Sequence, residues 1–363
     1  MTSLCVYFAI TSHGFGHATR TAAVISALQT QATAHDLNLK VIVATTAPIW
    51  LLKSYISQPF IYHPVTLDIG VVQSDSFTMD KDATLAKWQE LYHNQSALIH
   101  QELAVIRQHQ VDLIFADLPP LASAIAQAAH IPCWAASNFG WDLIYQAWSG
   151  FEFIVEWITD LHRHCDLLLR LPFHEPMASF PQTIDCGFTG GSPKYSLELL
   201  RQEFNLSSDR PTALLTFGGL SLDAIPYHQL ARFPEWQFLT FDSKAPELAN
   251  LIKLNAHPDL RPVDFMPLCD RLIAKPGYST LSEACRQQLP TICLTRPDFR
   301  EAEYLLDGLR QYNHHLIISP QEFYESDWQF MHQNLQPPTA AQVPANQAEQ
   351  AIARHLINYL NCL

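Results

Sequence analysis

Apolar runs of strand length alternate with helical patterns along most of the chain. In the first half, runs with the length and composition of buried strands lie at residues 4–10, 40–45, 59–63, 111–116, 132–136 and 165–171. Helical periods of apolar residues lie between them, at residues 18–29, 82–108, 120–129 and 142–163. Because alternating strands and helices are joined by crossover connections, the pattern predicts an α/β domain with a largely parallel sheet.

The alternation is interrupted once and then resumes. Residues 172–195 are rich in proline and glycine and have little periodicity, which predicts an interdomain connection. The strands predicted after it are at residues 212–217, 236–241, 263–265, 271–274, 291–294 and 315–318, and the helices are at residues 279–288, 301–312 and 345–361. We therefore expect two α/β domains, at residues 1–185 and 186–345, with a ligand in the cleft at the carboxyl ends of their strands.

Composition and charge narrow the classes of partner. The 363 residues carry 22 Lys and Arg against 35 Asp and Glu, a net charge of −13, which disfavours nucleic acid as a partner. The eight cysteines form no C-x-x-C pair, which indicates reduced thiols and a cytoplasmic protein. No apolar stretch approaches the roughly 20 residues of a membrane span, and the N-terminus does not have the pattern of a signal peptide, so we expect a soluble protein without a transmembrane segment.

Residues 12–20 (SHGFGHATR) join the first predicted strand to the first predicted helix. A glycine turn at this place is a common site for anions, but Thr19 replaces the third glycine of a dinucleotide fingerprint. The two histidines suggest proton transfer instead, because a helix N-terminus favours a neutral imidazole that can accept a proton. Such a base needs an orienting partner, and Asp117 follows a neighbouring strand. The alternative is that His13 and His17 are only polar residues at a helix start.

Two glycine turns follow strands in the second half. Residues 216–219 (TFGG) end one strand, and residues 274–283 (AKPGYSTLSE) lead from another into a helix. Hydroxyls and N–H groups at that helix start favour a diphosphate, and Glu283, one turn later, is suited to the diol of a ribose. The alternatives are a simple chain reversal at the first turn and a capping box, Ser279 or Thr280 with Glu283, at the second.

These motifs, in this order, resemble those of GT-B glycosyltransferases. The closest likeness is to the glycosyltransferase-like N-terminal region of plant L-arabinokinases, and a more distant one is to UDP-glycosyltransferases. Residues 68–75 (DIGVVQSD) and 137–145 (SNFGWDLIY) share it, and it spans about residues 4–335. The resemblance implies two facing Rossmann-like domains with parallel sheets and an interdomain cleft. Residues 1–185 would bind the acceptor and residues 186–345 the donor, and we expect the helix at 346–363 to pack back toward the first domain.

The resemblance also implies roles for single residues. His17 matches the base that deprotonates the acceptor, Asp117 the aspartate that orients it, and His13 is a neighbour that touches donor or acceptor. The donor-binding positions are Gly16, Gly218, Gly219, Phe265, Lys275, Gly277, Tyr278, Ser279, Thr280, Glu283 and Glu301. Among them, Phe265 would support a uracil ring, Glu283 would grip the ribose and Glu301 the hydroxyls of the sugar. The residues expected to line an acceptor pocket are Asp68, Gln73, Asn138, Trp141 and Asp142.

The implied reaction is transfer of a sugar from a nucleotide sugar, expected to be a UDP-sugar, to a hydroxyl of a small-molecule or lipid-linked acceptor. It would be an inverting single displacement with no tightly bound cofactor and no bound metal. Two departures leave the donor open: Lys275-Pro276 stands where the plant enzymes usually have a histidine, and Arg300-Glu301 where they have Asp-Gln. The alternative functions are a non-catalytic sugar-nucleotide-binding regulatory module and a non-hydrolysing sugar-nucleotide epimerase. Which histidine is the base is also left open.

Overall fold

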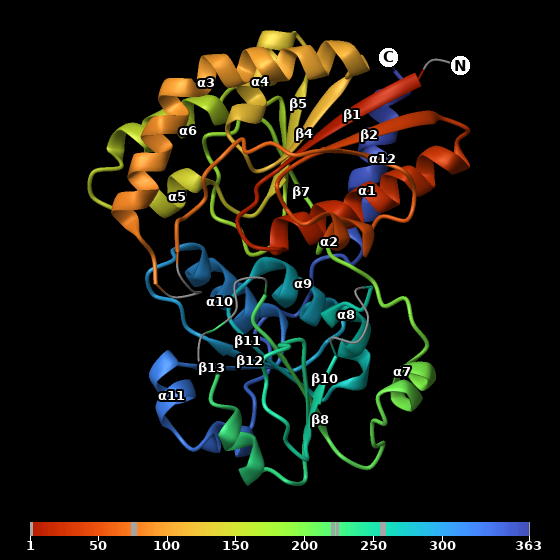
Figure 1. The fold of residues 1–363 in the computed structure, drawn as a ribbon, viewed down its shortest axis with the longest axis vertical. Coiled ribbons are helices and arrows are strands. Elements are labelled where there is room, and N and C mark those ends of the chain that lie inside the picture. Colours follow the sequence, from red (N-terminus) through yellow and green to blue (C-terminus); the bar gives the residue numbers. More distant parts are fainter. Residues whose placement is uncertain (1–2, 74–77, 219–221, 223–224, 255–258, 363) are drawn as a thin grey trace. The chain divides into compact units, whose positions relative to one another are not determined.

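The computed structural model describes residues 3–73, 78–218, 222, 225–254 and 259–362. These residues form two compact units. The first contains the described residues up to 73, residues 78–190 and residues 344–362, and the second contains the described residues between 191 and 343. Each unit has a parallel sheet with helices, so the predicted α/β class is confirmed (Figure 1).

The first unit is built on a seven-stranded sheet in the order β3-β2-β1-β4-β5-β6-β7. Its strands are β1 (Ser3–Ile10), β2 (Asn38–Ala44), β3 (Ile61–His63), β4 (Leu113–Asp117), β5 (Cys133–Ser137), β6 (Leu167–Arg170) and β7 (Thr183–Asp185). Its helices are α1 (Gly16–Ala34), α2 (Ile49–Lys53), α3 (Lys81–His109), α4 (Leu121–Ala129), α5 (Trp141–Tyr145), α6 (Glu152–His162) and α12 (Ala348–Leu360). Every residue of β4 is buried, as expected for a central parallel strand.

The strand order of this sheet creates a switch point between β1 and β4. From β1 the chain builds outward through β2 and β3, and it then returns to place β4 on the other side of β1. The register pairs Ile10 with Asp117, so both strands end at the same level. Open α/β sheets bind ligands in the crevice at such a point.

Two predictions for the first unit need correction. Residues 142–163 were expected to form one helix, but the structure has α5 and α6 with Gly150 between them at φ +86°, a left-handed conformation that does not continue a right-handed helix. The segment expected to be a connection, residues 172–195, contributes β7 to the sheet edge. All three residues of β7 are exposed, so no apolar run marked it in the sequence.

The second unit has a six-stranded sheet in the order β10-β9-β8-β11-β12-β13. Its strands are β8 (Thr212–Thr216), β9 (Gln237–Thr240), β10 (Leu251–Lys253), β11 (Arg271–Ala274), β12 (Thr291–Leu294) and β13 (His315–Ile318). Its α-helices are α7 (Leu197–Glu203), α8 (Pro262–Phe265), α9 (Tyr278–Arg286), α10 (Glu301–Tyr312) and α11 (Pro320–Glu325), and its 3₁₀ helices are η1 (Tyr227–Arg232), η2 (Met266–Leu268) and η3 (Gln329–His332). The switch point lies between β8 and β11, where Thr216 pairs with Ala274.

The prediction of a strand at residues 263–265 is wrong, because this segment is helix α8. Pro262 takes the first helical position, where its missing N–H costs nothing. Asp264 accepts hydrogen bonds from the backbone N–H and the guanidinium of Arg261, which closes the first turn. The apolar run reflects burial rather than extended backbone.

The C-terminal helix α12 belongs to the first unit, where Figure 1 shows it beside α1. Gln31 Nε2 in α1 donates to the carbonyl oxygen of Gln350 at 2.9 Å. The segment that enters the first unit again lies next to the segment that leaves it. Phe188 N donates to the oxygen of Ala345 at 2.8 Å, and Ala348 N donates to the oxygen of Phe188 at 3.0 Å. A Cβ at Gly187 would lie 2.0 Å from that Ala345 oxygen, so only glycine permits the approach.

Candidate functional site

Asp117, the last residue of β4, is the centre of a buried polar cluster in the first unit. Its Oδ1 lies 2.7 Å from His17 Nδ1 and 2.5 Å from Arg20 Nη2. Its Oδ2 accepts from Arg20 Nε at 2.7 Å and from Thr21 Oγ1 at 2.6 Å. All these donors lie on the first turns of α1. They point toward Asp117 together because positions three and four apart share one face of a helix. Asp117 and Arg20 are almost wholly buried, and His17 keeps 8 % of its surface exposed.

The contacts select the tautomer of His17. Arg20 Nη2 also approaches His17 Nδ1, at 3.0 Å, but a guanidinium nitrogen only donates. If Nδ1 accepted that bond, its lone pair would face the carboxylate oxygen of Asp117 at 2.7 Å, which is repulsive. The proton of the neutral ring therefore belongs on Nδ1, where it is donated to Asp117. His17 Nε2 is then an acceptor.

Charge and burial have opposite effects on the pKa of the Asp117 carboxyl. Burial alone would raise the pKa of its carboxyl, but the charge of Arg20, then that of His17, and the hydrogen bonds from both hold this pKa well below its usual range. Arg20 is in turn fixed from β5 and the residue after it. Its Nη1 donates to Asn138 Oδ1 at 2.7 Å, and its Nη2 donates to Ser137 Oγ at 3.1 Å.

His13 is fixed in the opposite tautomer. Its Nδ1 lies 3.2 Å from the backbone N–H of Val71, which can only donate, so Nδ1 carries the lone pair and Nε2 the proton. Gly70, at φ +59°, makes the approach possible, because a Cβ there would lie 2.7 Å from His13 Cβ. The ring of Trp141 contacts both histidines, edge-on to His13 at 5.2 Å and tilted toward His17 at 6.3 Å between ring centroids.

Of the residues predicted to line an acceptor pocket, Asp68 and Trp141 are bonded to each other. Trp141 Nε1 donates to Asp68 Oδ2 at 2.8 Å, and Thr11 Oγ1 donates to Asp68 Oδ1 at 2.9 Å. Burial raises the pKa of Asp68 to about 6, although the bonds from Thr11 and Trp141 lower it in part. Trp141 has no exposed surface, so it packs against the two histidines from within the core.

The other predicted acceptor residues are spread around this cluster. Asn138 is fully buried and holds Arg20, so it is a support and its side chain does not face solvent. Asp142 keeps 8 % of its surface, and its Oδ1 lies 3.6 Å from His162 Nδ1. Gln73 is half-buried and pairs with Met79 in an isolated bridge. The structure therefore groups Asp68, Asn138 and Trp141 with the histidines through contacts and places Asp142 beside His162.

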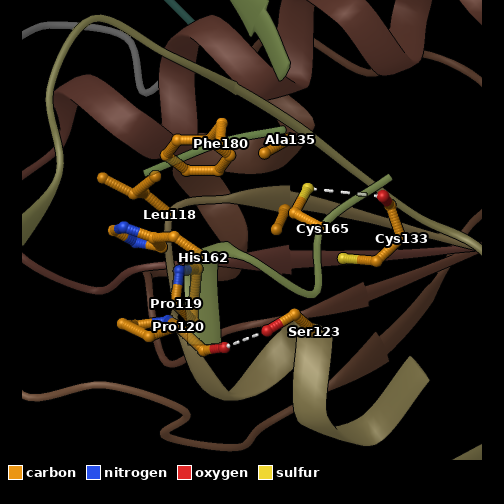
Figure 2. A pocket seen from close by; sticks show the side chains of 10 residues that line it. Leu118, Pro119, Pro120, Ser123, Cys133, Ala135, His162, Cys165 and Phe180 are labelled. Carbon is orange, nitrogen blue, oxygen red and sulfur yellow. Dashed lines mark hydrogen bonds between the residues drawn. The ribbon is translucent and has the colours of Figure 1, made fainter. Parts of the chain in front are cut away.

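Figure 2 shows a small cavity in the first unit, whose wall includes Ala116 and Leu118, the two neighbours of Asp117 in the chain. Its wall consists of Ala116, Leu118, Pro119, Pro120, Ser123, Cys133, Ala135, His162, Cys165 and Phe180. The rings of His162 and Phe180 are stacked, with centroids 4.5 Å apart, and Cys165 Sγ lies 3.3 Å from the carbonyl oxygen of Cys133. Within the described ranges, no three His, Cys, Asp or Glu side chains are grouped as metal ligands. No predicted site residue lines this cavity.

In the second unit, predicted donor-binding residues lie at the carboxyl ends of β8 and β11. Gly218 has φ +72°, and a Cβ on it would be 3.6 Å from Cε of Lys275, so the lysine extends along the glycine. Gly277 is the residue before α9, and Tyr278, Ser279 and Thr280 form its first turn. A lysine next to a helix N-terminus favours an anion. Gly219 lies outside the described residues.

Glu283 departs from the capping-box interpretation. The cap position of α9 is Gly277, which has no side chain, and the Glu283 carboxylate instead accepts from Gly191 N at 2.7 Å. The carboxyl is buried, and this burial raises its pKa to about 7, although the Gly191 bond and the charges of Arg261 and Arg286 act in the opposite direction. Glu283 therefore fixes the start of the second unit to α9.

This raised pKa predicts a pH dependence of stability. Folding raises the Glu283 pKa above its ordinary value of 4.5, so the folded state binds the proton more tightly and loses stability as the pH rises from about 4.5 to 7. Glu283→Gln does not titrate, and over this range its unfolding free energy is expected to fall by about 2–3 kcal/mol less than that of the wild type. The measurement is the urea midpoint of the second unit at both ends of the range.

The control for this experiment is Glu235→Gln, a change at an exposed glutamate of the same unit. It is expected to follow the wild-type pH dependence. Equal slopes for Glu283→Gln and the wild type would contradict the assignment of a raised pKa to Glu283.

Two further donor predictions fall on buried residues. Phe265 has no exposed surface, and its ring packs edge-on against Phe204 and Phe241, at 5.3 and 5.9 Å between centroids. The structure thus places Phe265 in the core rather than on a surface that supports a uracil ring. Glu301 is the first residue of α10 and retains 8 % of its surface.

Arg20 and Thr21 are the site residues that the sequence analysis missed. Arg20 ends the 12–20 motif and Thr21 follows it, but an arginine near a helix start is typical of a solvated surface. The signal that would have found them is spacing: positions 17, 20 and 21 share one face of α1, and that face meets the carboxyl end of β4.

The chain is similar in sequence to part of a known protein. No protein-family model matches the chain. Over 317 residues the chain is 31 % identical to an L-arabinokinase of Arabidopsis thaliana, and the match covers 84 % of the chain but only 29 % of that protein. The chain therefore corresponds to less than a third of this longer relative.

The similar solved structures show the fold. The calicheamicin glycosyltransferase CalG4 matches with a TM-score of 0.61 and 12 % identity, covering 100 % of this chain and 95 % of that one. UGT89C1 of Arabidopsis thaliana, complexed with UDP, matches with a TM-score of 0.56 and 13 % identity over 99 % and 95 %. A putative UDP-N-acetylglucosamine 2-epimerase of Listeria monocytogenes matches with a TM-score of 0.52 and 11 % identity over 81 % and 80 %. The chain thus has the GT-B fold of glycosyltransferases, as predicted. Among its described residues, no helix is both long and apolar enough to cross a membrane.

Proposed function

We propose that the protein transfers a sugar from a nucleotide sugar, with UDP as the nucleotide, to a hydroxyl group of an acceptor, and that His17 is the base. The observation that carries this proposal is the fixed tautomer of His17 at the switch point between β1 and β4. With Nδ1–H donated to Asp117 at 2.7 Å, Nε2 holds a lone pair ready for a proton. A base held in one tautomer by a carboxylate is the arrangement that general-base catalysis needs.

The proposed reaction is a single displacement at the anomeric carbon. The acceptor oxygen forms its bond to this carbon while the bond from the carbon to the diphosphate breaks, which inverts the configuration. The acceptor proton passes to His17 Nε2, and the electron pair of the broken bond leaves with the nucleoside diphosphate. Asp117 stabilises the resulting imidazolium through the Nδ1–H bond. His13, with its proton on Nε2, would serve as a hydrogen-bond donor to a substrate oxygen rather than as a base.

The second unit offers the features that a departing diphosphate requires. Gly218, Lys275 and the N-terminus of α9 gather N–H groups and a positive charge where β8 and β11 end. Fixed donors at a site of developing negative charge supply much of the rate enhancement in such reactions. The likeness to UGT89C1, which has been solved with UDP and with quercetin, supports a UDP-sugar as donor. We extend this to a small-molecule or lipid-linked acceptor, a reaction without a bound metal and a cytoplasmic location.

A panel of nucleotide sugars tests this proposal. At a concentration of about 100 times Kd, the correct donor is expected to stabilise the protein by about 2.7 kcal/mol, which appears as a rise in Tm. Slow hydrolysis of the same donor is expected without an acceptor, and transfer is expected when a hydroxyl acceptor is added. The proposal fails if folded protein shows neither a Tm shift nor turnover with any UDP-, GDP-, TDP- or ADP-sugar.

The same panel separates two other functions. The likeness to the Listeria epimerase favours an epimerase as the second candidate, which would yield an epimeric nucleotide sugar without an acceptor. The likeness to part of an L-arabinokinase fits a regulatory module that binds a nucleotide sugar without turning it over. The module would show a Tm shift alone, and His17→Ala would leave its binding intact.

A further inference from the structure

Asp117 accepts hydrogen bonds that occupy both of its oxygens fully. Oδ1 faces His17 Nδ1 and Arg20 Nη2, and Oδ2 faces Arg20 Nε and Thr21 Oγ1. A carboxylate has about four lone-pair positions, so each position has one donor. A proton could reach Asp117 only by displacing one of these donors.

We propose that Arg20 is a positioning residue: it holds Asp117 as an immobile acceptor, so that Asp117 orients His17 but does not take its proton. The part that concerns sugar transfer rests on the proposed function, whereas the part that concerns Asp117 does not. Arg20 donates to both oxygens of Asp117, from Nε to Oδ2 at 2.7 Å and from Nη2 to Oδ1 at 2.5 Å, and such a forked pair fixes a carboxylate in direction as well as position.

The burial of the pair requires this complete bonding. Arg20 keeps 2 % of its surface exposed and Asp117 keeps 1 %. A buried ion pair loses its hydration and is tolerated only when further hydrogen bonds satisfy the remaining groups. For Arg20, Asn138 and Ser137 supply those acceptors from the end of the neighbouring strand β5. The guanidinium is thereby fixed to two strands as well as to its own helix.

The charges around Asp117 decide where the proton of the acceptor stays. The titratable or charged groups near this carboxylate are His17 and Arg20 on α1 and Asp68 before α3, while β5 and its end contribute the uncharged Ser137 and Asn138. Arg20 and Asp117 neutralise each other. A proton taken up by His17 therefore remains on the imidazole and does not pass to Asp117.

The first experiment reads the ionisation of Asp117 directly, without any substrate. The protein is labelled with ¹³Cγ-aspartate, the Asp117 signal is assigned with Asp117→Asn, and its shift is followed with pH. In the wild type the pKa of Asp117 is held well below its usual range, so its signal is expected to stay that of a carboxylate. In Arg20→Met burial remains but the charge of Arg20 is lost, and the carboxyl is expected to protonate at a higher pH. An unchanged titration of Asp117 in Arg20→Met overturns the proposal.

The first unit contains a matched control. Arg170 also grips an aspartate with two bonds, from Nε at 2.7 Å and Nη2 at 3.1 Å to Asp185, but Asp185 is exposed. Arg170→Met removes a forked pair of the same kind, and it is expected to leave the Asp117 signal and the turnover as they are in the wild type. Equal effects of Arg170→Met and Arg20→Met on Asp117 would show that the effect is general rather than specific to Arg20, which also overturns the proposal.

The second experiment separates orientation from charge. Arg20→Lys keeps the positive charge but cannot form the two parallel bonds, so Asp117 is expected to stay ionised while kcat falls about tenfold or more and the donor KM changes by less than about threefold. If Arg20→Met does not fold, this variant alone decides, and a wild-type kcat for Arg20→Lys overturns the proposal. If the wild type turns over no nucleotide sugar but Asp117 titrates as expected, the proposed function fails and the role of Arg20 toward Asp117 stands.

Discussion

Replacing His17 with alanine is expected to lower kcat for sugar transfer about 10²–10⁴-fold, which is the usual contribution of a positioned general base. The loss follows from the chemistry at Nε2: without it, the acceptor hydroxyl must give its proton to water while the new bond forms. Asp117 would keep its bonds from Arg20 and Thr21, so the fold of the cluster is expected to persist. Steady-state kinetics with a fixed donor, together with circular dichroism, measures both effects.

His17→Asn and His13→Ala are the comparisons that make this result specific. Asparagine at position 17 places an amide N–H where His17 has Nδ1, but it accepts no proton, so it is expected to be as inactive as alanine. His13→Ala is expected to lose less, because His13 Nδ1 already accepts a hydrogen bond from Val71 N and its Nε2 carries the proton. If His13→Ala abolished transfer while His17→Ala remained active, His13 would be the base and the assignment would be wrong.

Replacing Asp117 with alanine is expected to be the most destabilising single change in the cluster. It leaves the guanidinium of Arg20 buried without its ion-pair partner, and removal of one member of a buried ion pair costs about 3–5 kcal/mol. Urea unfolding of the first unit measures this loss as a lower midpoint. The expected activity is also low, because His17 loses the acceptor for its Nδ1–H.

Asp185→Ala gives the matched comparison in the same unit. It also removes the aspartate of a forked Arg–Asp pair, but that pair is exposed, and exposed pairs contribute about 0–1 kcal/mol. The losses of unfolding free energy caused by Asp117→Ala and Asp185→Ala should therefore differ by several kcal/mol, because only the first pair is buried. Equal midpoints for the two variants would mean that water reaches Arg20 and that the cluster is not sealed.

The pairing of His17 with Asp117 was predictable because it depends on topology. The sequence places one residue after the first strand and the other at the end of a later strand, and parallel neighbours end at the same edge. The role of Arg20 was not predictable in the same way. Its position on the helix is visible in the sequence, but its partners Asp117 and Asn138 are about 100 residues away, and only the packing of α1 onto β4 and β5 brings them together.

The predictions that proved wrong have local physical causes. Residues 263–265 have the composition of a strand, but Pro262 and the Arg261–Asp264 bonds favour a helical turn. The predicted long helix is interrupted at residues 146–151, where Gly150 adopts a positive φ that glycine permits but does not require. Phe265 matched a ligand position by alignment of motifs, yet the way α8 packs turns its ring into the core. Burial of this kind depends on tertiary contacts, which a single sequence does not display.

The return of α12 to α1 makes the first unit discontinuous along the chain, with the second unit inserted between residues 190 and 344. During synthesis on a ribosome, α1 emerges before the second unit, but Gln350, the partner of Gln31, follows 319 residues later. The entropic cost of closing such a loop grows only with the logarithm of its length, so the order of synthesis matters more here than the length. The helix that carries His17 and Arg20 therefore acquires this outer cover only after the second unit and α12 have been synthesised.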